Sequence, residues 1–242
     1  MSHANHARIA KGESNKLLIE DRPIHEWYRF VLSFPPHLVR DYVRRFGLDR
    51  RHHVLDPFCG TGTTLVECKK LGISSVGVEA NPVAHFASAV KLDWSLDPDG
   101  LAEHARQVAD EASAVLERNQ IEDEFHPLFS RTGLQPVDPS PLRTLDPEKR
   151  ALLLSNSISP LPLHKTLVLH ECLTRSREER CHRHELLALA KALVYSISNL
   201  HFGPEVGVGP PKSDVPVLAP WLAEVRTMAD DLRQWRGCLQ PG

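Results

Sequence analysis

The segment Val54–Thr64, with the sequence Val-Leu-Asp-Pro-Phe-Cys-Gly-Thr-Gly-Thr-Thr, constrains the fold more than any other part of the chain. It predicts a buried strand that ends at Asp56, a turn through Gly60 and Gly62, and a helix that begins near Thr63. An α/β sheet presents a small ligand in this way at the carboxyl end of a strand. The glycines let the backbone approach a ligand that a Cβ would block, and the helix N-terminus favours an anionic group. We therefore expect an α/β fold with a ligand site at this turn.

Two common ligands do not suit the turn. A phosphate-binding P-loop needs Gly-Lys-Ser/Thr, but Gly62 is followed by Thr63 and Thr64. A dinucleotide site needs a third glycine or alanine three residues after the second glycine, where this chain has Leu65. The turn therefore binds neither ligand in the usual manner.

The whole string from Val54 to Thr64 closely resembles the S-adenosylmethionine (SAM) loop of the amino methyltransferases that modify adenine N6 or cytosine N4 in DNA. The resemblance implies a Rossmann-like, SAM-dependent methyltransferase fold. It also implies that the carboxylate of Asp56 faces the methionine amino group and that the loop backbone lies along the methionine portion. The cofactor-binding residues implied in this loop are Asp56, Pro57, Phe58, Cys59, Gly60, Thr61, Gly62, Thr63 and Thr64.

An acidic residue follows at the spacing expected of a ribose ligand. Residues 65–71 predict a short helix that Gly72 ends, and residues 75–79 predict the next strand. Glu79 lies 23 residues after Asp56, where its two carboxylate oxygens can accept from the vicinal hydroxyls of a ribose. The alternative is an acid that only complements the dipole of a following helix, which Asn81-Pro82 opens. We favour the ribose role and include Ala80 and Asn81 in the site.

Residues 25–39 resemble the segment that precedes the SAM loop in the same family. That resemblance places Phe34 and Pro35 beside the cofactor. Pro36 suits the first turn of a helix, and the apolar positions that follow recur at helical spacing as far as Gly47. Taken alone, the segment predicts only a core helix with a proline start. Together the resemblances cover roughly residues 25–95.

The catalytic residues are unknown, because the motif that this family uses is absent from the sequence. An aromatic amine is a poor nucleophile, and the family overcomes this with Asp/Asn/Ser-Pro-Pro-Tyr/Phe, which accepts from the amino group and stacks on the flipped base. Residues 34–37 and 209–212 each contain Pro-Pro, but neither stretch has the polar first residue or the aromatic last one. We expect these 242 residues alone to transfer no methyl group, with the motif located beyond Gly242 or on a second polypeptide.

Two alternatives to a DNA amino methyltransferase stay open. The Asp-Pro-Phe-Cys-Gly-Thr-Gly string also resembles tRNA guanine-N2 enzymes, so the chain could be part of an RNA base methyltransferase. It could also be a non-catalytic SAM-binding or remnant protein. The Phe-Pro-Pro segment ahead of the loop favours DNA.

The chain divides into four predicted segments. Residues 1–22 form a flexible N-terminal tail, and residues 23–98 form the SAM-binding α/β core. Residues 99–200 form a helical insertion with a Pro-rich loop at 119–145, and residues 201–242 form a return segment with a C-terminal helix.

The sheet is expected to be incomplete, because only two central strands, at 53–56 and 75–79, are clear. The chain would then correspond to the first half of a larger enzyme. Apolar side chains of these strands should be left exposed, namely Val54, Leu55, Val76 and Val78.

Charge and cysteine usage indicate a cytoplasmic protein that does not bind DNA strongly by itself. Lys and Arg number 29 against 31 Asp and Glu, whereas a free-standing DNA-binding domain is usually basic. DNA is therefore the expected partner only through the complete enzyme. Five cysteines at irregular spacing are typical of a reducing compartment. No apolar run approaches the length of a membrane span.

Two further clusters favour a structural interpretation. Arginines gather at 40–51 and at 175–183, where solvated helix faces are a simpler explanation than phosphate contacts. A second group suggests zinc: His170, Cys172, Cys181, His182 and His184. However, zinc ligands usually come in pairs two to four residues apart, and the two cysteines are nine apart. We expect no metal.

Overall fold

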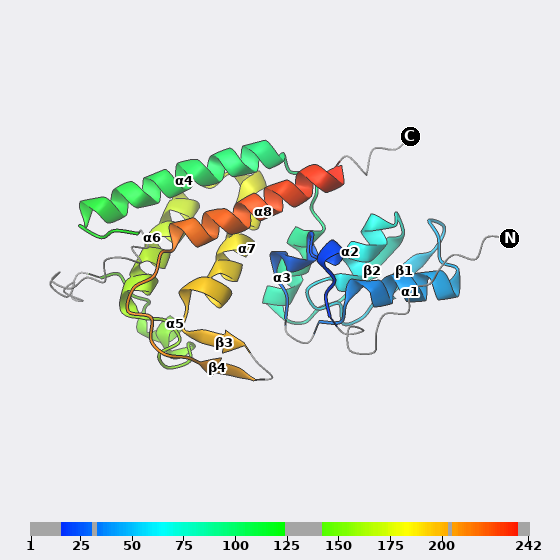
Figure 1. Ribbon diagram of the computed structural model, residues 1–242, viewed down its shortest axis with the longest axis horizontal. Helices are drawn as coiled ribbons and strands as arrows, with labels where there is room; N and C mark the ends of the chain where they lie inside the picture. The colour runs from blue at the N-terminus through cyan, green and yellow to red at the C-terminus, as the bar shows by residue number, and fades with distance from the viewer. Residues whose placement is uncertain (1–15, 31–32, 124–141, 203–204, 237–242) are drawn as a thin grey trace. The chain divides into compact units, whose positions relative to one another are not determined.

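The computed structural model describes residues 16–30, 33–123, 142–202 and 205–236. The chain forms two compact units, residues 1–93 and 94–242 (Figure 1). The elements of the first unit are η1 (Ile19–Asp21), η2 (His25–Trp27), α1 (Pro36–Phe46), β1 (His53–Asp56), α2 (Thr63–Lys70), β2 (Ser74–Gly77) and α3 (Pro82–Lys91).

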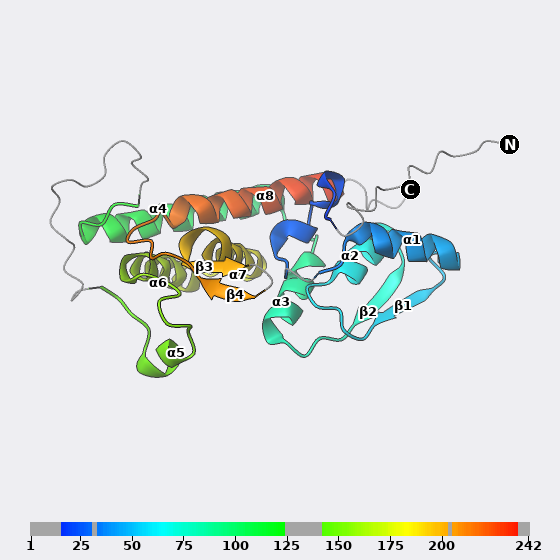
Figure 2. The same ribbon diagram turned by 60° about the horizontal axis from the view of Figure 1, so that its bottom comes forward.

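The centre of the first unit is a β1–α2–β2 unit. The two strands pair in parallel, with His53 opposite Ser74 and Asp56 opposite Gly77 (Figure 2). Both predicted strands and the intervening helix are present, although the second strand spans residues 74–77 rather than 75–79. The first strand, which was predicted as buried, alternates between exposed and half-buried side chains. The expected α1 is also present, from Pro36 to the left-handed Gly47 that caps its end. The described residues thus show a mixed helix and strand fold that is compatible with an α/β methyltransferase.

The two faces of this small sheet differ in burial. On one face Val54 packs against a buried cluster of Val39, Val43, Cys68 and Ile73. The side chains that point the other way are exposed, namely Leu55, Val76 and Val78. The expected exposure therefore holds for these three side chains and is wrong for Val54, which the α1 and α2 helices half cover. Parallel sheets are normally covered on both faces, so this apolar surface is unusual.

A buried network of charged groups ties the start of the described chain to α1 and α2. Glu67 of α2 is 1% exposed and lies 2.8 Å from Nε2 of His25 and 2.7 Å from Nη1 of Arg40. Arg40 also pairs with Asp21 at 2.7 Å, and Nζ of Lys70 lies 3.2 Å from Glu67. Asp21 belongs to η1, within the segment that the sequence predicted as a tail. Residues 19–21 instead form a short 3-10 helix, in which Asp21 is buried and pairs with Arg40.

The network makes the first unit sensitive to acid. Burial lowers the pKa of His25 from 6.5 to about 4. The positive charge of nearby Lys70 lowers this pKa further, whereas the hydrogen bond to Glu67 opposes the shift. Folded His25 therefore stays neutral between pH 6.5 and 4, while unfolded His25 takes up a proton, so stability falls as the pH falls through this range. We expect a loss of about 2–3 kcal/mol from this group.

The matched variant is His25→Gln, which keeps a donor for Glu67 but cannot titrate. Urea unfolding of the wild type and the variant between pH 7 and about pH 4.5 tests this expectation, because this pH range begins just above the ordinary histidine pKa and extends below it. The stability advantage of the wild type over the variant should shrink as the pH falls. An advantage that is constant with pH would mean that His25 titrates normally in the fold.

The second unit is mainly helical. Its elements are α4 (Pro98–Arg118), α5 (Pro147–Ala151), α6 (Pro160–Arg175), α7 (Glu179–Ala192), the π-helix η3 (Leu193–Ile197), β3 (Leu200–Phe202), β4 (Val206–Val208) and α8 (Leu218–Arg236). Helices α4 and α8 lie side by side, over α6 and α7 (Figures 1 and 2). Helix α4 buries an apolar stripe at Leu101, Ala105, Val108, Ala112 and Leu116. Among the described helices, none has both the length and the apolar character needed to cross a bilayer.

The residues predicted as a return segment belong to this second unit. β3 and β4 pair with each other as an antiparallel hairpin and form a sheet separate from β1 and β2. Asp123 accepts hydrogen bonds from the backbone of Val217 and Leu218, and this caps the start of α8. Most of the predicted Pro-rich loop, residues 124–141, lies outside the described residues.

Candidate cofactor-binding site

The parallel pairing of β1 and β2 brings both strand ends to one place. Val78 N donates to the carbonyl of Asp56 at 2.9 Å, and Cys59 N donates to the carbonyl of Val78 at 3.0 Å. The turn after β1 is thus bonded to the end of β2. Predicted site residues that are distant in sequence, Asp56 and Glu79, therefore lie at the same edge of the sheet.

The carboxylate of Glu79 organises the loop. Its Oε2 accepts from Gly60 N at 2.8 Å, and its Oε1 accepts from Asn81 N at 2.7 Å. A carboxylate has about four lone-pair positions, so each oxygen can still accept one further hydrogen bond. Asp56 accepts from Phe58 N at 3.1 Å through Oδ1. Both acids therefore hold the turn and keep capacity for hydroxyl or ammonium donors of a ligand.

The two glycines of the loop meet different requirements. Gly60 has φ +53° and nothing within 4 Å of the place where a Cβ would stand, so its surface is open to a ligand. Gly62 has φ +89°, and a Cβ there would lie 2.9 Å from Cβ of Ser88 on α3. Gly62 is thus required for packing as well as for backbone conformation, whereas Gly60 is the residue that permits close approach from outside.

The remaining loop residues divide by exposure. Phe58 is 86% exposed, and Pro57 is exposed beside it. Cys59 is buried, and its pKa is raised by burial and by the charges of Asp56 and Glu79, so its thiol is neutral. The other buried residues are Thr61, Gly62 and Thr63, and the half-buried ones are Asp56, Gly60, Thr64 and Glu79. The loop therefore offers backbone and carboxylate groups, with Phe58 as an uncovered aromatic ring.

The predicted residues outside the loop lie on neighbouring elements. Asn81 caps α3 by accepting from Val83 N at 2.9 Å and Ala84 N at 3.1 Å, and Ala80 precedes it in an exposed position. Phe34 and Thr64 line an apolar hollow of about 380 Å³ between α1, β1 and α2, while Pro35 is buried. Asp56 and Glu79 are not among the residues that line this hollow.

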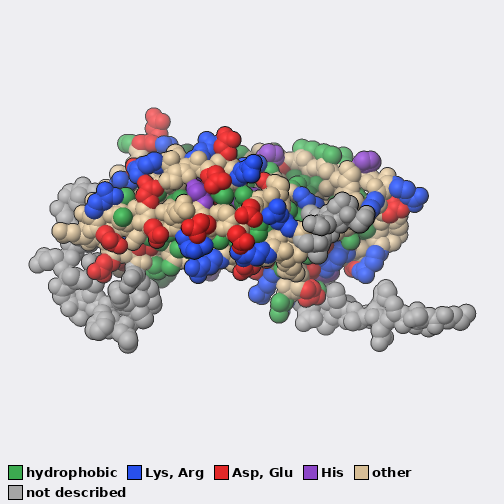
Figure 3. Space-filling model, turned by 90° about the horizontal axis from the view of Figure 1, so that it is seen from above, with side chains coloured by type: hydrophobic (Ala, Val, Ile, Leu, Met, Phe, Trp, Pro, Cys, Tyr) green, Lys and Arg blue, Asp and Glu red, His purple; other side chains and the backbone are tan. Residues whose placement is uncertain are grey.

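Some arginines of each cluster pair with carboxylates. In the first unit Arg40 contacts Glu67 and Asp21, and Arg51 lies 2.7 Å from Asp49. In the second unit Arg175 pairs with Glu111 and Glu171 at 2.6 and 2.7 Å. Figure 3 shows acidic and basic side chains mixed on one face of the molecule. These contacts favour the structural interpretation of the clusters over phosphate binding.

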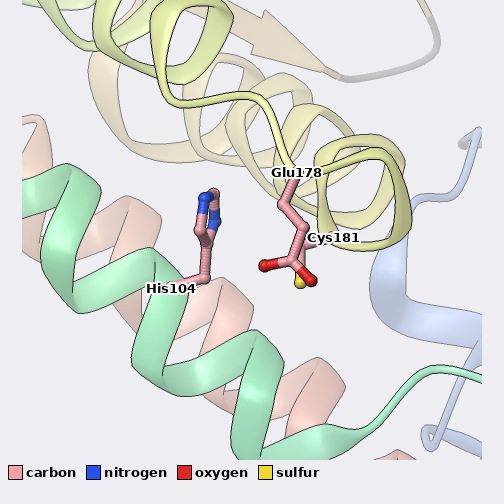
Figure 4. A group of neighbouring side chains, drawn as sticks. All are labelled: His104, Glu178 and Cys181. Atoms are coloured by element: carbon pink, nitrogen blue, oxygen red, sulfur yellow. The ribbon is translucent and has the colours of Figure 1, made fainter.

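A side-chain group that the sequence did not predict lies in the second unit. His104, Glu178 and Cys181 each offer a possible metal-ligand atom, and these atoms lie within 4.8 Å of one another (Figure 4). Of the residues that suggested zinc in the sequence, only Cys181 belongs to a group of this kind within the described part of the chain. Sequence spacing could indicate Glu178 with Cys181, three residues apart at the start of a helix, but not His104, which is on another helix.

Comparison with known proteins finds sequence similarity in the first unit of the chain. The profile of the DNA methylase family matches residues 7–89. A type II methyltransferase of Geobacillus stearothermophilus, M.BsoBI, is 40% identical over 80 residues, which cover 33% of this chain and 15% of that protein. M.MjaII of Methanocaldococcus jannaschii is 35% identical over 69 residues, covering 28% of this chain and 13% of the relative. M.AvaI of Nostoc sp. is 29% identical over 76 residues, covering 31% and 15%.

The matches thus span only a small share of the length of these curated relatives. No solved structure matches the chain significantly.

Proposed function

We propose that this chain supplies the SAM-binding portion of a DNA adenine-N6 or cytosine-N4 methyltransferase. The match of residues 7–89 to the profile of the DNA methylase family is the premise of this proposal. The observation that carries the proposal is the bond from Gly60 N to Glu79, which joins the glycine turn to a second strand-end acid. This arrangement provides two carboxylates and an open backbone turn at one sheet edge. The cellular setting that suits this function is the cytoplasm.

The proposed cofactor lies over the turn after β1. Asp56 binds the methionine amino group, and the backbone near Gly60 lies along the methionine portion, where the open space permits close approach. The free lone pairs of Glu79 accept from the two ribose hydroxyls. Exposed Phe58 and the Phe34 side of α1 supply apolar contacts for the remainder of the cofactor.

Methyl transfer requires groups that these 242 residues do not contain. The sequence has no Asp/Asn/Ser-Pro-Pro-Tyr/Phe. We infer that a polypeptide segment carrying this motif, in the same protein or in a second one, acts with the SAM-binding unit on DNA. The exposed apolar face at Leu55, Val76 and Val78 supports this inference, because it offers a surface on which such a segment could pack.

Calorimetric titration with SAM tests the proposed cofactor site. Asp56→Asn and Glu79→Gln should each lower the SAM affinity by roughly 10–100-fold, because each removes a hydrogen bond to a charged acceptor worth about 1.5–3 kcal/mol. Asp41→Asn is the matched control, since Asp41 is an exposed acid on α1 that pairs with nearby Arg44. Equal affinity in all four proteins would place the cofactor elsewhere.

Labelled SAM and mixed duplex DNA then test the catalytic part of the proposal. The chain alone should leave the DNA unlabelled, and addition of a polypeptide with the Pro-Pro-aromatic motif should produce label on adenine N6 or cytosine N4. Label on DNA with the chain alone would overturn the inference. Label on RNA only would favour the RNA methyltransferase alternative, and SAM binding without any transfer would favour the non-catalytic one.

A further inference from the structure

The group formed by His104, Glu178 and Cys181 belongs to the helical unit, whereas the proposed cofactor site belongs to the first unit. His104 projects from α4, and the other two side chains come from the start of α7 (Figure 4). Their possible ligand atoms all lie within 4.8 Å of one another. Facing helices of a bundle are a common place for a metal site, because each helix holds its ligands rigidly.

The helical spacing of α7 aligns three donor residues on one face. Cys181 and Glu185 lie four residues apart on α7, and Glu178 is the N-cap residue of this helix. Glu178 and Cys181 lie near His104 and Glu185 bonds to it, so the three form a stripe that faces α4. Cys181 is 2% exposed and Glu185 is fully buried. Glu178 is exposed, and although it occupies the N-cap position of α7 its side chain makes no capping hydrogen bond. The stripe thus runs from a solvent-accessible carboxylate to buried donors, which gives an ion a path of entry.

Glu185 supports the histidine in the manner of an outer-shell metal partner. Its Oε1 lies 2.6 Å from Nδ1 of His104, and its Oε2 is buried without a hydrogen-bond partner among the described residues. Nε2 of His104 lies 2.7 Å from the carbonyl of Ser176, two residues before Glu178. Metal-binding histidines typically use one ring nitrogen for the metal and bond the other to a carboxylate. In His104, Nδ1 contacts the carboxylate of Glu185, and Nε2 points toward the start of α7.

Charge also favours a cation at this place. Glu178 and Glu185 place two carboxylates on the stripe that also holds Cys181. A divalent ion would compensate several carboxylates and stabilise the thiolate at once.

We propose that His104, Glu178 and Cys181 bind a zinc-class divalent ion, with Glu185 positioning His104 from behind. A donor set of imidazole, thiolate and carboxylate suits Zn²⁺, with bonds of about 2.0–2.3 Å. Tetrahedral bonds of that length put the donor atoms roughly 3.3–3.8 Å apart, so the group must contract by about 1 Å. Exposed Glu178 has the freedom to make this movement, and Nε2 of His104 exchanges the Ser176 carbonyl for the ion. The bound ion would join α4 to α7.

Zinc titration of the whole chain, in competition with a chromophoric chelator, tests the site. The wild type should bind one zinc ion tightly, and Glu185→Gln should weaken binding by roughly 10–100-fold, as changes to outer-shell partners do. Cys181→Ser and Glu178→Gln should weaken it further. Cys172→Ser is the matched control, because Cys172 is another buried cysteine of the same unit that is not part of the group.

Cobalt substitution and thermal melts keep the test independent of other histidines and cysteines. Co²⁺ should give a thiolate-to-metal charge-transfer band in the wild type and in Cys172→Ser, and this band should be absent from Cys181→Ser. Zinc should raise the melting temperature of the first two proteins only. Equal zinc binding by Cys181→Ser and Cys172→Ser, or a wild type without the charge-transfer band, would overturn the proposal. If Cys181→Ser does not fold, exposed Glu178→Gln gives the same comparison through zinc affinity.

Discussion

Replacement of Glu67 by alanine is expected to cost the first unit about 3–5 kcal/mol of folding free energy, the usual penalty for breaking a buried ion pair from one side. Glu67 is 1% exposed and contacts His25, Arg40 and Lys70 at 2.8, 2.7 and 3.2 Å. Burial would raise its pKa, but the hydrogen bond from His25 and the charge of Lys70 lower it to about 2. Without the carboxylate, buried His25 loses its partner and the two cations are left less compensated.

Chemical denaturation of the whole chain measures this loss, and two further variants define its origin. Glu67→Met keeps most of the volume but not the charge, so it should remain strongly destabilised if electrostatics dominate. Glu26→Ala is the surface control, since Glu26 pairs with Arg22 at 3.6 Å with both side chains well exposed, and its loss should cost less than about 1 kcal/mol. A Glu67→Met protein as stable as the wild type would show that the alanine variant fails because of a cavity alone.

Local sequence signals predict several helix boundaries of this protein. Prolines at 36, 82 and 147 mark helix starts, and each of these helices begins at its proline. Gly47 marks the end of α1 because it adopts the left-handed conformation there. The strand–turn–helix string also predicts the turn correctly. Such features depend on a few neighbouring residues, so a single sequence contains the information.

Contacts between distant residues could not be predicted in the same way. The Glu67–His25 bond spans 42 positions, and the His104–Glu185 bond spans 81. Nothing in the helical pattern of α2 distinguishes buried Glu67 from a solvated acid, because its burial depends on where η2 and α1 pack. The candidate zinc group has the same origin, since His104 becomes a possible ligand only when α4 lies against α7. The strands β3 and β4 likewise form their own hairpin, which no alternation in so short a segment would indicate.

Truncation of Trp221 to alanine is expected to destabilise the helical unit by about 3–5 kcal/mol, the typical cost of removing a buried large aromatic side chain. Trp221 lies near the start of α8, is fully buried, and belongs to the interface that α8 makes with α7. Its indole Nε1 donates to the carbonyl of Glu185 at 3.0 Å. The side chain thus combines apolar burial with a hydrogen bond to the residue that supports His104 in the proposed metal site.

Substitution by phenylalanine separates these two contributions. Trp221→Phe retains most of the buried apolar surface and loses the hydrogen bond, so its cost should be about 1–2 kcal/mol. Arg226→Ala is the control on the same helix, because Arg226 is exposed, and its effect should stay within about 0.5 kcal/mol. Unfolding followed by far-ultraviolet circular dichroism avoids the loss of tryptophan fluorescence in the variants. If the unfolding free energy of Trp221→Ala lies within about 1 kcal/mol of the wild-type value, α8 does not pack on α7 through this residue, because truncation of a fully buried tryptophan normally costs more than that.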